Sequence, residues 1–232
     1  MRRRFFVDEV RNGHAQIEGE DARHLTRVLR VEAGQRYEIS DNRNVYLAEI
    51  ETARKEHVVF RTLEKLPPPE AGTRFILCAA LIKFDHFEWM IEKATELGVA
   101  EIIPVQTARS EHGLERAAQK RIERWRRIAL EASQQARRAF LPQITGPVKL
   151  ERAAAIEAGR RLAFDEASAA PVRAAAQAES VALLIGPEGG WTDEERTLFR
   201  GWESVSLGPL ILRAETAAIA ALAIAGAMSR IQ

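Results

Sequence analysis

The sequence carries very little cysteine or histidine chemistry. Its 232 residues include a single cysteine, Cys78, which excludes an internal disulfide and a cysteine-based zinc site and agrees with a reducing compartment. The five histidines are scattered, and no two of them have the spacing of metal ligands on one helix. We therefore expect no bound metal. The pattern gives no role to any histidine, and His24 and His112 are best explained as surface or capping residues.

Long apolar segments and several familiar motifs are also missing. The longest apolar run, 217–228, is too short to cross a bilayer and is better explained as a buried helix. The basic start of the sequence has no apolar signal-peptide core, so we expect a cytoplasmic protein with no membrane partner. There is no P-loop, no GxSxG nucleophile elbow and no GxGxxG after the first strand. A kinase, a serine hydrolase and an ordinary dinucleotide enzyme therefore lose support.

Neither sign of charge is in excess over the whole sequence. The 34 Lys and Arg residues nearly balance the 33 Asp and Glu residues, for a net charge of +1, which argues against a protein that coats nucleic acid indiscriminately. The average conceals a basic block, because residues 105–140 hold nine basic and four acidic side chains while each neighbouring segment is net acidic. A local excess of this kind is what an RNA-binding surface requires.

A run of three prolines at positions 67–69 divides the sequence, because neither a helix nor a central strand passes through it. We expect one domain over residues 1–71 and a second over residues 72–232. The first has short strand patterns and one helix pattern (20–31), which predicts a small β-barrel. It shows no catalytic constellation, so we expect it to bind a partner. The expected strands are 5–8, 14–19, 37–40, 45–51 and 57–64.

The second domain alternates between strand and helix patterns, which predicts an α/β domain with a mainly parallel sheet. Continuous apolar runs indicate strands that are covered on both faces. The last helix is apolar nearly all round, so we expect the core or a partner to bury every side of it. The Ala-rich stretch 167–178 is expected to be a loop and a surface helix. The expected strands are 75–82, 101–107, 160–166, 181–185 and 204–207. The expected helices are 87–97, one long basic helix at 115–139, 193–200 and 215–230.

Two strand ends in this domain lead into glycine-containing loops. The first is Val181-Ala-Leu-Leu-Ile-Gly-Pro-Glu-Gly-Gly-Trp-Thr-Asp193, where three glycines in five residues follow an apolar strand. Ligands of open α/β sheets bind outside the carboxyl ends of the strands, and glycines let the backbone approach such a ligand closely. A turn that merely needs a positive φ would explain one of these glycines. It does not easily explain all three.

The second loop lies in Ser204-Val-Ser-Leu-Gly-Pro-Leu-Ile-Leu-Arg-Ala-Glu-Thr-Ala217. Its apolar residues predict that a ligand or another part of the chain covers it, since loops usually run over the polar surface. Arg213 and Glu215 follow directly, before an apolar helix. They could form an ordinary ion pair that caps the helix. We favour a liganded Arg213, because arginine suits an anionic or carbonyl-rich group.

These residues carry a family resemblance. The paired motifs Leu184-Ile-Gly-Pro-Glu-Gly-Gly190 and Leu207-Gly-Pro-Leu-Ile-Leu-Arg-Ala-Glu-Thr-Ala217 resemble the signature of the SPOUT (trefoil-knot) RNA methyltransferases. Within these, the sequence is most similar to the bacterial 16S ribosomal RNA uridine-N3 methyltransferase family. Segments 92–99 and 131–137 resemble its interior motifs, and 24–30 resembles its N-terminal domain, so the resemblance covers nearly the whole chain. Trp191 stands where we expect Phe or Leu.

The resemblance implies an RNA-binding PUA-like β-barrel over 1–71 and a trefoil-knotted SPOUT α/β methyltransferase domain over 72–232. It also implies that the cofactor is S-adenosylmethionine and that the partner is 16S rRNA within the 30S subunit. It further implies a homodimer whose active site lies near the dimer interface. Arg213 is the candidate to stabilise charge on the uridine, and Glu215 to orient Arg213 or the loop or to act as a base. The residues expected to hold the cofactor are Leu184, Ile185, Gly186, Pro187, Glu188, Gly189, Gly190, Leu207, Gly208, Leu210, Ile211 and Leu212.

Arginines are the candidates for RNA contact, because a guanidinium binds phosphate in bidentate fashion and stacks on unpaired bases. For any one of them, a solvated helix face is the simpler explanation. The alternatives to uridine-N3 methylation are methylation of another base or of a ribose 2′-hydroxyl, and a non-catalytic RNA-binding assembly factor. The candidate RNA-binding residues are Arg2, Arg3, Arg4, Arg23, Arg27, Arg30, Arg109, Arg124, Arg127, Arg137 and Arg138.

Overall fold

The computed structural model describes residues 3–70, 72–168, 170–172 and 178–229. The chain divides into two compact units. The first comprises Met1–Glu70 and Ser133–Leu141, and the second comprises Ala71–Ala132 and Pro142–Gln232.

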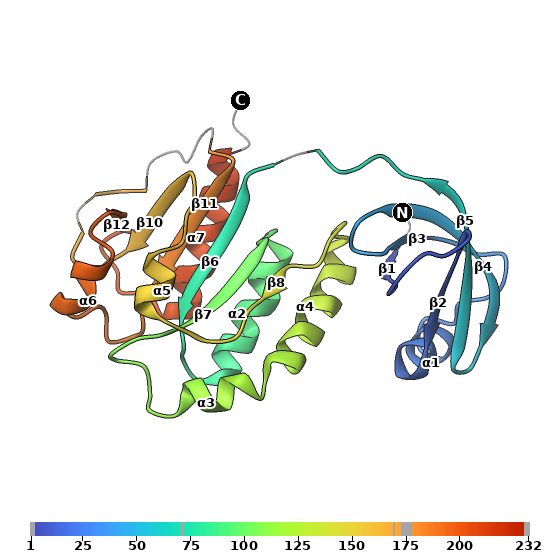
Figure 1. Ribbon diagram of the computed structural model, residues 1–232, viewed down its shortest axis with the longest axis horizontal. Helices are drawn as coiled ribbons and strands as arrows, with labels where there is room; N and C mark the ends of the chain where they lie inside the picture. Colours follow the sequence, from blue (N-terminus) through green and yellow to red (C-terminus); the bar gives the residue numbers. More distant parts are fainter. Residues whose placement is uncertain (1–2, 71, 169, 173–177, 230–232) are drawn as a thin grey trace. The chain divides into compact units, whose positions relative to one another are not determined.

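The first unit is a curled five-stranded sheet with one helix, α1 (Gly19–Arg27) (Figure 1). The sheet order is β1-β3-β4-β5-β2, and every pairing is antiparallel except that of β1 with β3. Alternating side chains of these strands turn inward, so Phe5, Ile39 and Phe60 form a core with Leu25 of α1. The strands are β1 (Arg4–Phe6), β2 (His14–Glu18), β3 (Arg36–Ser40), β4 (Val45–Arg54) and β5 (His57–Lys65).

The segment Ser133–Leu141 belongs to this first unit although it is distant in sequence. The hydroxyl of Ser40 donates a 2.6 Å hydrogen bond to the carbonyl of Ala139, and the amide of Leu141 donates one of 2.7 Å to the side-chain oxygen of Asn42. The domain boundary expected from the sequence, between residues 71 and 72, places this segment in the second domain. The partners are 99 residues apart, so no local pattern could have revealed the pairing.

The second unit is built on one sheet of seven strands, whose described pairings are all parallel. Its order is β12-β10-β11-β6-β7-β8, with β9 also paired to β7, so the expected parallel sheet is confirmed. The strands are β6 (Arg74–Ala80), β7 (Glu101–Gln106), β8 (Gln143–Ile144), β9 (Val148–Lys149), β10 (Arg160–Phe164), β11 (Ser180–Ile185) and β12 (Glu203–Val205). The helices are α2 (Phe84–Glu96), α3 (Leu114–Gln119), α4 (Ile122–Ala136), α5 (Leu150–Ala154), α6 (Asp193–Leu198) and α7 (Ala214–Ser229).

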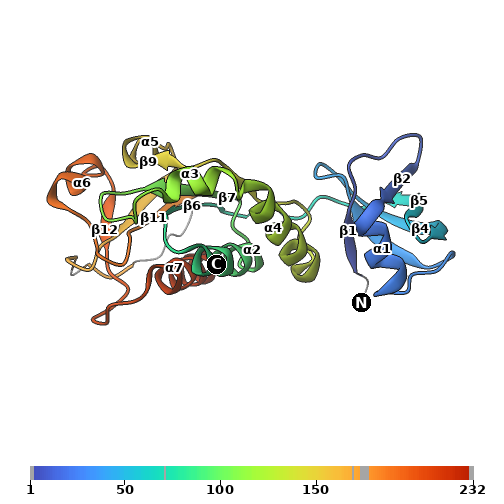
Figure 2. The same ribbon diagram turned by 90° about the horizontal axis from the view of Figure 1, so that it is seen from below.

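Helices cover both faces of this sheet, and the side chains of β6 show how. Leu77 and Ala79 join the core formed with α2, α4 and α7, whereas Ile76 and Cys78 join the core formed with α5 and the aromatic residues on either side of α6. Figure 2 shows these layers, with α2 and α7 on one side of the strands and α5 on the other. Burial on both faces explains why the sequence of β6 is apolar without alternation. Burial also raises the pKa of the Cys78 thiol to about 12, which makes it unreactive.

The single long helix expected at 115–139 is wrong, because α3 and α4 are separate helices. The amides of Lys120 and Arg121 donate to carbonyls three residues back, which ends α3 in a tighter turn before α4 begins at Ile122. Ala118, Ile122 and Trp125 are nevertheless all buried, with the spacing of one continuous helix. The hydrophobic period therefore runs through the break, and periodicity could not reveal it.

Helix α7 packs against α2, β6 and β11 but is not buried on every side. Ala218, Leu222 and Ala225 face the core, whereas Ala223 and Ala227 are exposed. The core of the domain was one of two expected covers for this apolar helix, the other being a partner. The core covers one face of the helix only. No helix among the described residues has the length and apolarity needed to span a membrane. The surface helix expected within 167–178 falls largely on residues outside those described.

Candidate functional site

Three neighbouring parallel strands end at a cavity of about 260 Å³, which we call the glycine-loop cavity. Its walls include Phe164 at the end of β10, Ile185 at the end of β11 and Val205 at the end of β12. This is the edge of an open α/β sheet at which ligands bind. Eleven of the twelve residues expected to hold a cofactor line the cavity. The exception is Leu184, which is fully buried in the core on the α5–α6 side of the sheet.

The glycines are required by what lies beside them. Gly190 has φ +71°, which L side chains rarely adopt, so any other residue would strain the backbone there. A Cβ on Gly186 would lie 2.9 Å from the ring of Trp191, which is buried. The indole nitrogen of Trp191 donates a 2.9 Å hydrogen bond to the carbonyl of Phe164. A Phe or Leu side chain could not donate this bond, so Trp191 ties the glycine loop to the end of β10.

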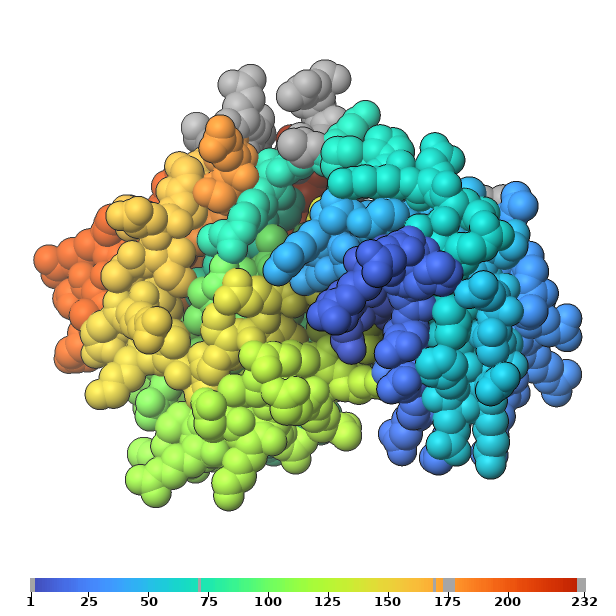
Figure 3. Space-filling model, turned by 45° about the vertical axis from the view of Figure 1, so that its right-hand side comes forward, coloured from blue at the N-terminus to red at the C-terminus, as the bar shows by residue number. Residues whose placement is uncertain are grey.

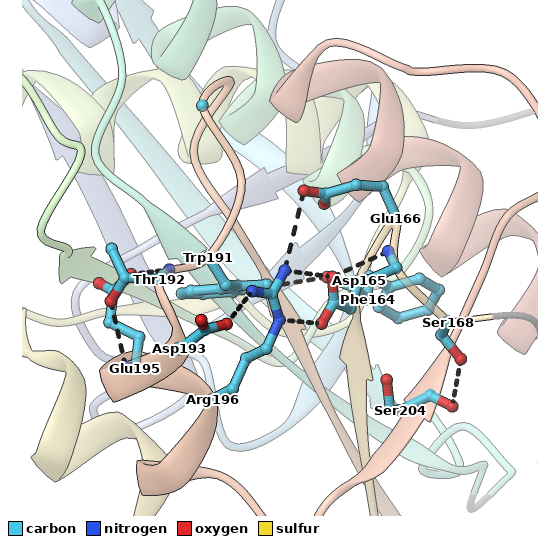
Figure 4. A network of polar contacts seen from close by, with 12 residues as sticks. Phe164, Asp165, Glu166, Ser168, Trp191, Thr192, Asp193, Glu195, Arg196 and Ser204 are labelled. Carbon is cyan, nitrogen blue, oxygen red and sulfur yellow. Dashed lines mark hydrogen bonds and ion pairs between the residues drawn. The ribbon is translucent and has the colours of Figure 1, made fainter.

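Beside the cavity, an ion pair between the buried Asp165 and the partly exposed Arg196 holds the end of β10 to α6 (Figure 4). The guanidinium of Arg196 donates to both carboxylate oxygens of Asp165, at 2.7 and 3.0 Å, and also contacts Asp193 at 3.1 Å. The hydrogen bond from Arg196 lowers the pKa of Asp165 despite its burial. Asp165 and the adjacent Glu166 both line the cavity and place two carboxylates beside it. Neither carboxylate is among the site residues expected from the sequence.

The loop after β7 is tied to the same structure through Glu195, which is buried. Its carboxylate accepts a 2.7 Å hydrogen bond from the amide of Ala108 and a 3.0 Å bond from the amide of Thr192, completing a capping box at the start of α6. From the other side, Arg109 donates to the carbonyl of Gly189. The loop after β7 and the glycine loop are therefore held together at two points.

A second cavity, of about 520 Å³, lies on the other side of the glycine loop. We call it the basic cavity, because Lys83, Arg109 and Arg213 line it together with His86. It shares part of its lining with the glycine-loop cavity. The shared residues are Pro187, Glu188, Gly189, Ile211 and Leu212.

Arg213 and Glu215, the two expected catalytic residues, have different surroundings. Arg213 is exposed, and its guanidinium makes no hydrogen bond or ion pair within the described part of the chain. Glu215 is only 4% exposed, and its Oε1 lies 3.1 Å from Nδ1 of His86. Among the described residues its other oxygen, Oε2, has no hydrogen-bond partner. The structure therefore pairs Glu215 with His86 and not with Arg213, a contact that sequence spacing could not reveal.

Of the two covers expected for the apolar loop before α7, a ligand or another part of the chain, the described chain does not supply the second. Leu210 and Ile211 are 78% and 87% exposed, so no other described part of the chain covers them. They line the glycine-loop cavity, where they form its most exposed apolar wall. Among the described residues no group of three His, Cys, Asp or Glu side chains is arranged to hold a metal ion.

Comparison with known proteins gives this geometry its context. Residues 69–226 match the model of an RNA methyltransferase domain, and residues 17–63 match that of an RNA methyltransferase PUA domain. The ribosomal RNA small subunit methyltransferase E of Bacillus subtilis is 31% identical, over 89% of this chain and 87% of its own length. That of Synechocystis is 34% identical, over 86% of this chain and 68% of its own. This chain belongs to the ribosomal RNA small subunit methyltransferase E family.

Solved structures agree with this assignment. A methyltransferase of Legionella pneumophila, solved with its bound cofactor SAM, is 30% identical with a TM-score of 0.84, covering 99% of this chain and 98% of its own. The Neisseria gonorrhoeae member of the family, bound to S-adenosyl methionine, is 25% identical with the same TM-score and coverage. The chain is thus an RNA methyltransferase, and the expected fold class, a SPOUT (trefoil-knot) α/β domain with a PUA-like domain, is confirmed.

The candidate RNA-binding arginines have diverse settings in this family member. In the first unit, Arg4 binds Glu38 and the carbonyl of Arg137, and Arg23 pairs with Glu56. Arg3, Arg27 and Arg30 are exposed, whereas Arg2 lies outside the described residues. Burial lowers the pKa of Arg138 to about 10.

In the second unit, the helices of the basic block lie at the surface, coloured yellow-green in Figure 3. Arg124 contacts Glu88 and Arg127 contacts Glu131, but both side chains remain about half exposed or more. Arg109 is part of the basic cavity. Part of the block's positive charge is therefore paired within the chain, which the count of charges along the sequence could not show.

Proposed function

We propose that this chain transfers the methyl group of S-adenosylmethionine to N3 of a uridine in 16S ribosomal RNA. One observation carries the proposal: two cavities share the glycine loop as a wall, at the carboxyl edge of a parallel sheet. The glycine-loop cavity has the residues to hold the methyl donor. The basic cavity offers cations to an RNA base. A shared wall suits a reaction in which the methyl group passes between two bound molecules.

The glycine-loop cavity fits S-adenosylmethionine by its chemistry. Apolar side chains such as Leu207 and Leu212 suit the adenine ring, and backbone N–H and C=O groups beside Gly186 can reach it without a Cβ between them. Glu166 offers a carboxylate to ribose hydroxyls or to the ammonium group. When bound, the cofactor supplies a methyl group that is already activated on a sulfonium. The protein therefore has mainly to align the reactants and to stabilise charge.

Arg213 is the residue we assign to charge stabilisation. Loss of the imide proton leaves negative charge on the two carbonyl oxygens that flank N3 of the uridine. The Arg213 guanidinium lines the basic cavity and makes no ion pair in the described chain, so it is available to those oxygens. We expect Arg213→Ala to slow methyl transfer by about 100-fold or more while leaving affinity for the cofactor nearly unchanged. Methylation near the original rate, or a loss of cofactor affinity alone, would refute this role.

We assign RNA binding to the PUA-like domain, residues 1–71, and to exposed arginines of both domains. Arg3, Arg27 and Arg30 in the first, and Arg124 and Arg127 in the second, are the candidates that remain exposed. Arg4 and Arg138, by contrast, are engaged inside the first unit. Since phosphate contacts make affinity depend on salt, loss of one contact should reduce the slope of log affinity against log salt by about one unit.

We also propose that the protein acts in the cytoplasm as a homodimer on the 30S subunit. Support for the dimer comes from apolar surface that one chain leaves exposed. The outer side of α7 bears Ala223 and Ala227, the preceding loop bears Leu210 and Ile211, and Trp89 of α2 is 47% exposed. Sedimentation at several concentrations would test the dimer directly.

The deciding experiment is methyl transfer with labelled cofactor to 30S subunits and to free 16S RNA, followed by nucleoside analysis. We expect N3-methyluridine, with subunits preferred over free RNA. Another methylated base or a 2′-O-methyl ribose would overturn the substrate and leave the methyltransferase fold intact. Cofactor-free RNA binding with no transfer would favour a non-catalytic assembly factor.

A further inference from the structure

His86 is the one described side chain within ion-pair distance of the buried carboxylate of Glu215. The imidazole stands on the first turn of α2, and the carboxylate on the first turn of α7. Nδ1 of His86 lies 3.1 Å from Oε1 of Glu215, which is within hydrogen-bonding reach. A carboxylate at this position favours the tautomer in which Nδ1 carries the proton and Nε2 keeps its lone pair.

The two residues differ in their access to the basic cavity. His86 lines it and its side chain is 35% exposed, whereas Glu215 is 4% exposed and is not part of the lining. The imidazole is therefore the group of the pair that can touch a base bound there. Its Nε2 is not hydrogen-bonded within the described structure, since the nearest carboxylate oxygen, on Asp85, is 3.8 Å away.

We propose that His86 is the general base of the methyl transfer and that Glu215 is its positioning residue. This inference rests on the proposed function, and it names the group that accepts the proton of uridine N3. Nε2 of His86 takes the proton from N3 as the N3 electron pair forms the new bond to the methyl carbon. The bond between that carbon and the sulfonium sulfur breaks, and the sulfur keeps its electrons, leaving S-adenosylhomocysteine. The imidazolium that results is stabilised by Glu215 and returns its proton to solvent.

The charges around the imidazole are compatible with this role. Glu215 lies where it can stabilise the positive charge that the imidazole gains when it accepts a proton. Arg213 then acts on the uridine oxygens while His86 acts on the proton, so the two residues have separate tasks. Besides Glu215, several charged groups lie near the imidazole of His86, either on the first turn of α2 or around the basic cavity. They are Lys83, Asp85, Arg109, Glu111, Glu188 and Arg213.

The test is the pH profile of the single-turnover rate, measured on 30S subunits with saturating S-adenosylmethionine. For the unmodified protein we expect the rate to rise across the range in which histidines titrate, about pH 5 to 8, and then to level. His86→Gln should lower the plateau about 100-fold or more and abolish that rise, with cofactor affinity unchanged. In Glu215→Gln the plateau should also fall, because the imidazolium formed during the transfer has lost its counter-charge, while the KM for 30S subunits and the affinity for the cofactor stay unchanged.

The first domain supplies a matched control. His57 lies 3.2 Å from Glu18 through the same pair of atoms, Nδ1 and Oε1, but on the exposed surface of the barrel. With 30S subunits in saturating amount, His57→Gln should leave the shape of the pH profile unchanged, because His57 is not part of the basic cavity. In a second measurement, added imidazole should restore part of the activity of His86→Ala, which a merely structural role for the side chain would not permit.

The possible outcomes separate the two proposals. If His86→Gln retains the rise with pH, or imidazole rescues nothing, the base is another group and the inference is overturned while the proposed function stands. If the unmodified protein methylates a position other than uridine N3, the proposed substrate fails, and the same profiles still decide whether His86 accepts the proton. No methyl transfer by the unmodified protein would overturn both.

Discussion

The buried pair of Asp165 and Arg196 supports a quantitative prediction. Arg196→Met keeps an unbranched side chain about as long as the arginine stem and removes the guanidinium and its charge, which leaves the buried carboxylate of Asp165 without a counter-charge. Removing one partner of a fully buried pair costs about 3–5 kcal/mol. Here the cost is smaller, because Arg196 is 30% exposed and solvent can reach the site. Asp165 also accepts a hydrogen bond from the amide of Ala167, which stabilises its carboxylate without Arg196. We expect a loss of about 2 kcal/mol in the free energy of unfolding.

The pH dependence of this loss follows from the pKa of Asp165. The hydrogen bond from Arg196 lowers that pKa in the folded protein, so the pair stabilises the fold fully above the ordinary aspartate value of about 4. As the pH falls below that value and through the folded-state pKa, Asp165 becomes protonated and the stabilisation is lost. The difference between the unmodified protein and Arg196→Met should therefore be full at pH 7 and shrink steadily below about pH 4.

Urea unfolding measures this loss, and a second ion pair provides the control. Arg160 and Glu203 are also bound through two hydrogen bonds, but the Glu203 side chain is 53% exposed. Glu203→Gln should therefore cost less than about 1 kcal/mol. A loss of less than about 0.5 kcal/mol in the unfolding free energy of Arg196→Met would refute this prediction. An equal loss in Glu203→Gln and in Arg196→Met would also refute it, since Glu203 is the more exposed carboxylate. Asp165→Asn combined with Arg196→Met should recover part of the loss, since no buried charge remains.

Three further predictions concern the glycine loop, helix α7 and the start of α6. Gly186→Ala should lower the unfolding free energy by about 1–3 kcal/mol in urea titrations, because its Cβ meets the buried, hydrogen-bonded ring of Trp191. Gly226→Ala, in the interior of α7 with open space around the new Cβ, should instead stabilise the protein by up to about 1 kcal/mol. Glu195→Ala should cost about 1–2 kcal/mol by opening the capping box, and equal costs for Glu195→Ala and for Glu194→Ala on the exposed side of the same turn would contradict this.

Much of the fold could be predicted from the sequence because its signals are local. Apolar runs indicate doubly covered strands, as in β6 and β11, and the glycine motifs mark the strand ends that form the cavity. Short elements were missed for a related reason. β8, β9 and α5 contain two, two and five residues, too few for any periodicity to show.

The parts of the site that were not predicted depend on contacts between distant residues. His86 and Glu215 are 129 positions apart, and nothing near either one in the sequence indicates the other. Asp165 and Arg196 likewise meet only because β10 and α6 pack together. The apolar loop around Ile211 is a different case. Its composition indicates that something covers it, but the sequence does not say whether the same chain or a ligand does so, and Ile211 is exposed in the chain alone.

The discontinuous first unit determines how the protein can be dissected. A fragment that ends at the prolines contains every strand of the barrel, yet it lacks Ser133–Leu141, and with it the partners of Ser40 and Asn42. In such a fragment, the surface around Ser40 and Asn42 that this segment covers would be exposed to solvent. Studies of RNA recognition by this barrel therefore need the intact chain, or a graft that returns those nine residues to it. Recombination at the prolines 67–69 would likewise separate the strands of the barrel from this segment.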